Sequence, residues 1–164
     1  MDFGLSAEQR LLEESLQRYL DANLPMQRVR KIATATDADD RELWRSLVDI
    51  GVPGTLVPVQ HGGVGLGLLD AVVVAHALGR VAAPVPFLGS AVMAVVALRE
   101  AGSESQQDAW LTRIATGDAL IGVAANEMVS KREGAGIEVR GSVLYGKSLF
   151  VVEGPSADAF RVAA

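Results

Sequence analysis

Histidine and cysteine, which often act as catalytic bases, nucleophiles and metal ligands, are scarce or absent in this 164-residue chain. It has two histidines and no cysteine, so disulfides, thiolate catalysis and cysteine-bound metals are excluded. No nucleophile or set of metal ligands accompanies His61, which favours a turn-capping or surface histidine over a general base. His76 lies in an apolar segment and predicts a core histidine bonded to a backbone carbonyl. We therefore expect no metal site.

The glycine-rich run at residues 62–67 has some likeness to a dinucleotide-binding loop. That motif needs a strand before it, a helix after it and an acidic residue about 20 positions further on. Here residues 51–60 are themselves rich in turn formers, and an apolar segment follows. A structural turn that uses positive φ angles is the better interpretation.

Charge and hydropathy exclude several kinds of partner. The net charge is −5, and the densest basic group is Arg28, Arg30 and Lys31, which argues against nucleic acid because phosphate binding needs a concentrated basic surface. The apolar stretches 71–78 and 91–98 are far shorter than the roughly 20 residues that span a bilayer. The amino terminus has no signal-peptide pattern. We expect a cytoplasmic protein with neither a membrane nor a nucleic-acid partner.

Capping patterns and apolar periodicity predict the helices. Ser6 and Gln9 form a capping-box pattern, which Ser103 and Gln106 repeat. Two of the helices are apolar nearly all round and should lie in the centre of a bundle. Residues 32–40 are expected to form a loop. The predicted helices are 6–22, 40–50, 68–82, 87–101 and 104–116.

After residue 118 the pattern changes to short apolar runs separated by glycine turns, which is typical of strands. We therefore expect two domains, a helical one at residues 1–118 and an incomplete β domain at residues 119–164. The fold class is mainly α, a five-helix domain followed by a partial antiparallel β segment. The predicted strands are 119–124, 136–140, 142–145, 149–152 and 159–164.

A set of motifs resembles the amino-terminal part of acyl-CoA dehydrogenases. The set spans residues 2 to 118 in that family's order and spacing, and no single motif in it is specific. Its members are Asp2-Phe3-x-Leu5-Ser6-x-Glu8-Gln9, Trp44-x-x-Leu47, Val57-Pro58, the turn His61 to Gly65, Ala77-Leu78-Gly79-Arg80, Pro84-Val85-Pro86, Trp110-Leu111 and Gly117-Asp118.

The resemblance implies a flavoprotein oxidoreductase that uses FAD to convert an acyl-CoA thioester into the α,β-enoyl-CoA. It also implies an acyl-CoA substrate, a helical domain that walls one side of the acyl pocket, and a homo- or hetero-oligomer. The family's proton-abstracting glutamate lies beyond this chain, so no catalytic residue is assigned within it. We expect this chain alone to be inactive.

The resemblance further implies three cofactor-binding positions, Glu127, Phe150 and Val152. Glu127 follows a predicted buried strand and is either cofactor-facing or a solvent-facing turn residue. Phe150 is either a flavin contact or a core aromatic. Val152 stands where the family has a hydroxyl residue, and the family's Thr/Ser-Glu-Pro segment reads Ala125-Asn126-Glu127-Met128 here. We expect the family's FAD not to be bound by this chain alone.

An alternative function remains open. The same departures favour a non-catalytic partner subunit of an acyl-CoA dehydrogenase-like hetero-oligomer, with a decayed flavin site. Residues 160–164 read as an apolar strand without its neighbours. That pattern fits either a piece of a longer protein or a subunit that another chain completes.

Overall fold

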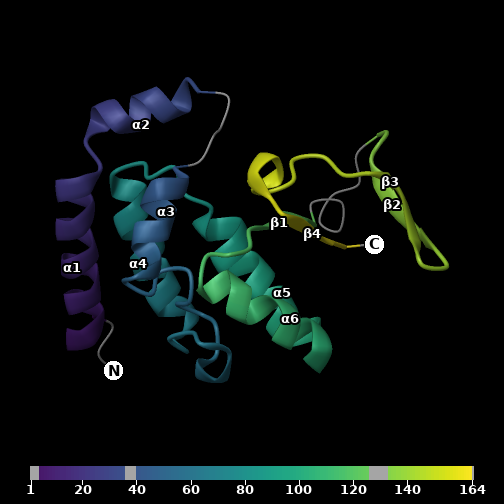
Figure 1. Cartoon of the computed structure of the whole chain (residues 1–164), viewed down its shortest axis with the longest axis horizontal. Coiled ribbons are helices and arrows are strands. Elements are labelled where there is room, and N and C mark those ends of the chain that lie inside the picture. The colour runs from purple at the N-terminus through teal and green to yellow at the C-terminus, as the bar shows by residue number, and fades with distance from the viewer. Residues whose placement is uncertain (1–3, 36–39, 126–132, 164) are drawn as a thin grey trace.

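The computed structural model describes residues 4–35, 40–125 and 133–163. Helices occupy most of the chain up to residue 115, and short strands follow (Figure 1). The five predicted helical regions are confirmed, and no strand lies between residues 68 and 101. The helices are α1 (Ala7–Asn23), α2 (Met26–Ala33), α3 (Arg41–Val48), α4 (Leu68–Arg80), a π-helix η2 (Phe87–Ala94) that continues into α5 (Val95–Ala101), and α6 (Glu104–Ala115), with a short 3₁₀ turn η1 (Val59–His61) before α4.

Side-chain caps fix the start of two helices where the sequence predicts them. Before α1, the backbone N–H of Gln9 donates to Ser6 Oγ (3.2 Å), and the N–H of Ser6 donates to Gln9 Oε1 (3.0 Å). Ser103 and Gln106 make the same reciprocal pair before α6 (3.3 and 3.0 Å). Each pair satisfies two donors that a helix start leaves without partners.

One hydrophobic core joins the helices to the first strand. Leu16 of α1, Leu47 of α3, Val95 of α5 and Leu111 of α6 all belong to it, as the apolar periodicity predicts. Val73 of α4 is buried but lies outside this cluster, to which α4 contributes Ala71, Val74, Ala77 and Leu78. In Figure 1 α1 runs alongside α4, and α2 crosses the end of the bundle.

Helix α2 lies partly in the stretch that precedes the predicted loop, and the sequence analysis did not predict it. None of its residues is fully buried, although Val29 is partly buried and packs against the core. An ion pair ties it to α3: Arg28 donates through Nε and Nη2 to Asp40, whose carboxylate also accepts from the N–H of Leu43 (2.9 Å). Asp40 is buried. α2 is therefore held by a contact between residues 12 positions apart.

The strands form two separate pairs. β2 (Gly136–Arg140) and β3 (Val143–Lys147) make an antiparallel hairpin, as expected for this segment. β1 (Ile121–Ala124) and β4 (Ala159–Val162) pair in parallel, which differs from the antiparallel expectation. The predicted strand at 149–152 is wrong. Positive φ angles at Phe150 (55°) and Glu153 (58°) prevent an extended run and leave a single bridge between Val152 and Val123.

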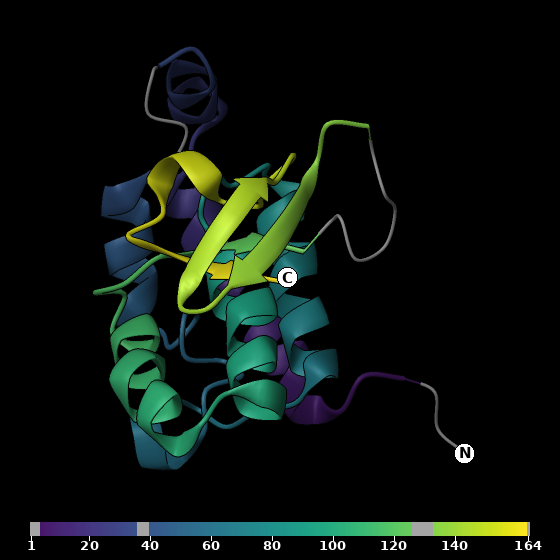
Figure 2. The ribbon, with the colours of Figure 1, turned by 90° about the vertical axis from the view of Figure 1, so that its right-hand side faces the viewer.

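The two strand pairs differ in their surroundings. β1 is buried throughout and packs on η2, whereas nearly every residue of the β2–β3 hairpin is exposed. Figure 1 shows the hairpin standing away from the helices, while β1 and β4 lie closer to them; in Figure 2, turned by 90°, the hairpin faces the viewer in front of the helices. A short 3₁₀ turn η3 (Gly154–Ser156) precedes β4. The junction of helices and β segment is therefore formed by η2, β1 and the residues around Glu153.

Candidate functional site

An apolar cavity of about 230 Å³ lies at that junction. Helix α4, the loop after it and the start of η2 supply its hydrophobic wall, Glu153 borders it from the β segment, and the cavity is open to solvent. Among the described residues that line it, Glu153 is the one with an ionisable side chain. The lining residues are Ala75, Leu78, Gly79, Ala82, Ala83, Val85, Phe87, Leu88 and Glu153.

The loop between α4 and η2 shapes the cavity. The backbone N–H of Ala82 donates to Gly79 O (3.0 Å), and that of Ala83 donates to Leu78 O (3.0 Å), so the chain turns back on the end of α4. Ala82 adopts a positive φ of 49° in this turn. Two prolines, Pro84 and Pro86, then lead into η2. π-Helical turns often occur at functional sites, because the wider turn displaces side chains from the regular α-helical positions.

Glu153 fastens the β segment to η2. Its Oε1 accepts a hydrogen bond from the backbone N–H of Gly89 (3.3 Å). A Cβ on Gly89 would lie 2.3 Å from Glu153 Cγ and 3.1 Å from Val152 Cγ1, so a glycine is needed at position 89 for this close packing. The sequence gives neither residue a recognisable role, because nothing in the local pattern near residue 89 points to a partner 64 positions away.

Ser90 makes a second link between η2 and the strands. Its side chain is fully buried, accepts from the N–H of Ile121 at 3.1 Å, and lies 3.5 Å from Ala119 O, to which it donates. A buried hydroxyl is stable when its donor and acceptor capacity is used, as it is here. The start of β1 is thereby fixed against the helical part.

The structure describes two of the three positions that the resemblance implies for cofactor binding. Glu127 lies outside the described residues. Phe150 is 69% exposed and does not belong to the hydrophobic core, so the core alternative is wrong. Val152 is half-buried, and its backbone N–H and C=O both bond Val123 at 3.0 Å. Val152 therefore offers no free backbone donor.

His61 lies in the 3₁₀ turn η1, one of its two expected environments, whereas His76 differs from its expected environment. His61 is buried, with Nδ1 3.6 Å from Asp108 Oδ1, which places it at a packed turn. The prediction of a core position for His76 is wrong: its side chain is 66% exposed and Nδ1 lies 2.8 Å from Glu13 Oε1.

Within the described ranges no three His, Asp or Glu side chains come together as metal ligands. No described helix is long and apolar enough to cross a membrane.

Comparison with known proteins identifies the family. The sequence model described as "Acyl-CoA dehydrogenase, N-terminal domain" matches residues 6–118. The chain is 36% identical over 165 residues to the acyl-CoA dehydrogenase FadE27 of Mycobacterium tuberculosis, a match that covers 100% of this chain and 44% of the relative. The chain belongs to the acyl-CoA dehydrogenase family, which is FAD-dependent. It spans less than half the length of this relative.

Solved structures agree with this placement. The ChsE4–ChsE5 complex from Mycobacterium tuberculosis contains a chain with 34% identity and a TM-score of 0.88, matched over 99% of this chain and 45% of that one. The structure of PigA with FAD and proline matches with 26% identity and a TM-score of 0.80, over 99% of this chain and 44% of that one. The fold of the described residues is therefore that of an acyl-CoA dehydrogenase amino-terminal part.

Proposed function

We propose that this chain forms the helical wall and the first strands of an enzyme that uses FAD to oxidise an acyl-CoA thioester to the α,β-enoyl-CoA. Membership of the family supports the reaction class. The apolar cavity between α4, η2 and Glu153 is the structural feature that supports it. In this assignment residues 1–118 are the amino-terminal domain and residues 119–164 begin the middle domain.

The proposed task of the cavity is to hold the hydrocarbon part of the acyl group. Leu78, Phe87 and Leu88 offer it aliphatic and aromatic surface, and Leu88 is still 56% exposed. Burying each methylene of a ligand contributes about 0.8 kcal/mol, so a medium acyl chain gains most of its affinity from such a wall. Small side chains at Ala75 and Gly79 leave room for it.

FAD would supply the hydride acceptor in the complete enzyme. Of the three cofactor-binding positions, the exposed ring of Phe150 could face an isoalloxazine. Val152 has no side-chain donor, and its backbone groups are already paired. These described residues do not suffice to hold the cofactor, so we propose that the chain alone purifies without FAD. A flavin absorbance band that survives gel filtration near stoichiometric amounts would contradict this.

No catalytic base is assigned within the chain. Glu153 reaches the cavity, but its Oε1 accepts from the N–H of Gly89, and we assign it the role of positioning η2 against the β segment. We therefore expect no dehydrogenation of butyryl- or octanoyl-CoA by residues 1–164 with a dye acceptor. Turnover by the chain alone would refute this assignment.

The second candidate is a non-catalytic subunit of a hetero-oligomer. Val152 in place of a hydroxyl residue favours it, and the similar ChsE4–ChsE5 structure is a complex. The two candidates differ in one respect: a catalytic chain needs the acyl cavity, whereas an assembly subunit does not. Binding of acyl-CoA to the cavity therefore discriminates between them.

The discriminating experiment is calorimetric titration with octanoyl-CoA and with free CoA. We expect octanoyl-CoA to bind more tightly, and Leu88→Asp to weaken it about ten-fold or more, because a buried leucine contact contributes roughly 1.5–3 kcal/mol. Leu11→Asp is the matched control, since Leu11 is 61% exposed on α1 and lies outside the cavity. Equal affinities for octanoyl-CoA and CoA, or equal effects of the two variants, would favour the assembly subunit.

A further inference from the structure

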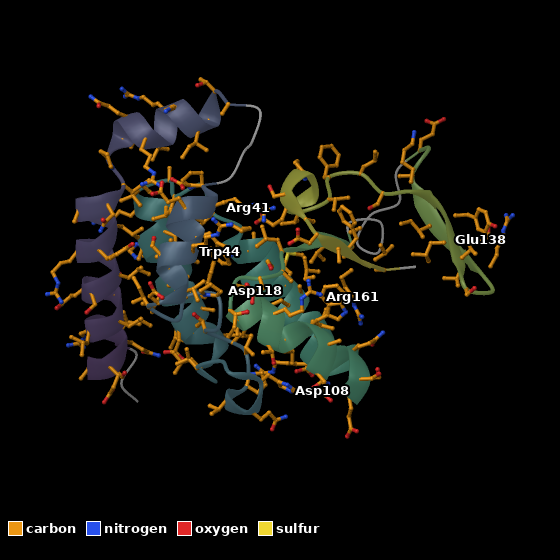
Figure 3. All side chains as sticks on the ribbon, viewed as in Figure 1. Arg41, Trp44, Asp108, Asp118, Glu138 and Arg161 are labelled. Carbon is orange, nitrogen blue, oxygen red and sulfur yellow. The ribbon has the colours of Figure 1, made fainter. Side chains whose placement is uncertain are left out.

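A second, polar cleft of about 300 Å³ lies on another side of the molecule, between α3, the end of α6 and the residue before β4. α3 contributes Arg41, Trp44 and Arg45, and the segments before β1 and β4 contribute Asp118 and Asp158. Figure 3 shows Arg41, Trp44 and Asp118 gathered where α3 faces the β segment. The proposed dehydrogenase function uses none of these side chains.

In this cleft the indole Nε1–H of Trp44 is a buried donor that has no acceptor among the described residues. Trp44 is 2% exposed. Gly117 has a φ of 71° and lies beside the indole: a Cβ there would lie 3.6 Å from Nε1 and 2.7 Å from Val48 Cγ2, so a side chain at this position would crowd α3. A buried donor without a partner is energetically unfavourable, so an occupant with an acceptor atom at this position is favoured.

Each of the two carboxylates in the cleft accepts a hydrogen bond from the protein through one of its oxygens. Asp118 Oδ2 accepts from Thr116 Oγ1 (2.7 Å), and Asp158 Oδ2 accepts from the N–H of Leu120 (2.8 Å). Their Oδ1 atoms make no contact with another described residue at hydrogen-bond distance. These interactions fix both carboxylates and leave acceptor capacity for a ligand.

The two guanidinium groups lie one helical turn apart. Arg41 Nη2 donates to Ser156 O (2.7 Å), which directs its side chain toward the β segment. Arg45 makes no ion pair within the described part of the chain, and neither arginine lies within 4.0 Å of the carboxylates of Asp118 or Asp158. Two positive and two negative side chains therefore line the cleft without forming ion pairs with each other. A ligand that carries both charges can bind between them.

We propose that this cleft binds a small dipolar molecule that carries both a carboxylate and an ammonium group, the chemistry of a free α-amino acid. The carboxylate accepts from Trp44 Nε1–H and from Arg45, and the ammonium group donates to Asp118 and Asp158. A simple anion would meet two carboxylates, and a simple cation would meet two guanidinium groups. A dipolar ligand satisfies both sides, because each of its charges faces the opposite sign.

The test follows the two indole N–H signals of the chain by ¹H–¹⁵N NMR, with Trp110 as the internal reference. The probes are glycine, acetate and methylammonium at equal ionic strength. We expect glycine to shift the Trp44 signal at about ten-fold lower concentration than either single-charge probe, since each charge-assisted bond contributes about 1.5–3 kcal/mol. A Trp44 signal that no probe moves would mean that water alone occupies the cleft, and would overturn the proposal.

Variants make the test specific. Arg45 is exposed, so Arg45→Met should leave the fold intact and weaken glycine binding about ten-fold or more. Arg10→Met, an exposed arginine of α1, removes the same charge away from the cleft and should change nothing. Equal effects of the two substitutions, or equal shifts by acetate and glycine, would overturn the dipolar site.

Discussion

Replacing Asp40 by alanine should destabilise the chain by about 2–4 kcal/mol. The carboxylate caps α3 through the N–H of Leu43, and the loss of such a cap costs about 1 kcal/mol. It also pairs with Arg28, and breaking a buried ion pair costs about 3–5 kcal/mol when the remaining charge stays buried. The Arg28 side chain is 30% exposed, so its guanidinium can be hydrated once Asp40 is removed. The cost of leaving that charge without a partner is therefore smaller than for a fully buried pair.

The pH dependence of this contribution follows from the pKa of Asp40. Burial raises that pKa, but the hydrogen bonds from Arg28 and from the N–H of Leu43, together with the charge of Arg28, outweigh it and leave the pKa below its ordinary value. A carboxylate with a lowered folded-state pKa stabilises the fold above its unfolded pKa of about 3.9 and loses this contribution as the pH falls through the folded-state pKa. The charge-dependent part should therefore be constant from pH 5 to 7 and shrink in more acidic solution.

Urea unfolding followed by circular dichroism measures both effects. Asp40→Asn keeps an acceptor for Leu43 but removes the charge, so it should cost less than Asp40→Ala, about 1–2 kcal/mol near pH 7. Arg28→Met completes a double-mutant cycle, in which Asp40→Asn should cost less once Arg28 is absent. A cost below about 0.5 kcal/mol for Asp40→Ala, or an Asp40→Asn penalty that grows as the pH falls below 4, would refute the reasoning.

Two further substitutions test other parts of the structure. Gly63→Ala should cost about 1–3 kcal/mol or more by thermal unfolding, because its Cβ would lie 2.1 Å from Val57 O, a backbone atom that cannot move aside; an unchanged melting temperature would contradict the turn geometry. Phe150→Ala should change the free energy of unfolding by less than about 0.5 kcal/mol, because that ring is 69% exposed; a loss above 1.5 kcal/mol would show that it packs in a core.

Local signals account for what the sequence predicts correctly. The capping boxes at Ser6 and Ser103 and the apolar spacing of Leu16 and Leu20 act within one helix, so they can be found by inspection of a few residues. Helix α2 lacks a side-chain cap and a buried residue, and its contacts with the rest of the molecule include the pair between Arg28 and Asp40 and the packing of the half-buried Val29 on the core. The ion pair depends on Asp40, which lies 12 positions after Arg28 at the end of the predicted loop and so outside the local pattern of α2.

The candidate site could be predicted in part. The resemblance led to residues around Phe150 and Val152, and the adjacent Glu153 does border the apolar cavity. The strand predicted there failed because positive φ angles at residues 150 and 153 do not follow from apolar side chains. Two features join segments that lie far apart in the sequence: the contact between Glu153 and Gly89, and the parallel pairing of β1 with β4. Local sequence patterns do not contain such contacts, so they could not be predicted.

Photoaffinity labelling tests the central claim, that α4 and η2 wall an acyl-binding cavity, most directly. The probe is octanoyl-CoA with a diazirine at the end of the acyl chain, and the labelled peptides are identified by mass spectrometry. We expect labelling to concentrate in residues 75–88, to be displaced by octanoyl-CoA but not by CoA, and to fall in Leu88→Asp. Label spread over α1 and α2, or label that CoA displaces equally well, would contradict the account.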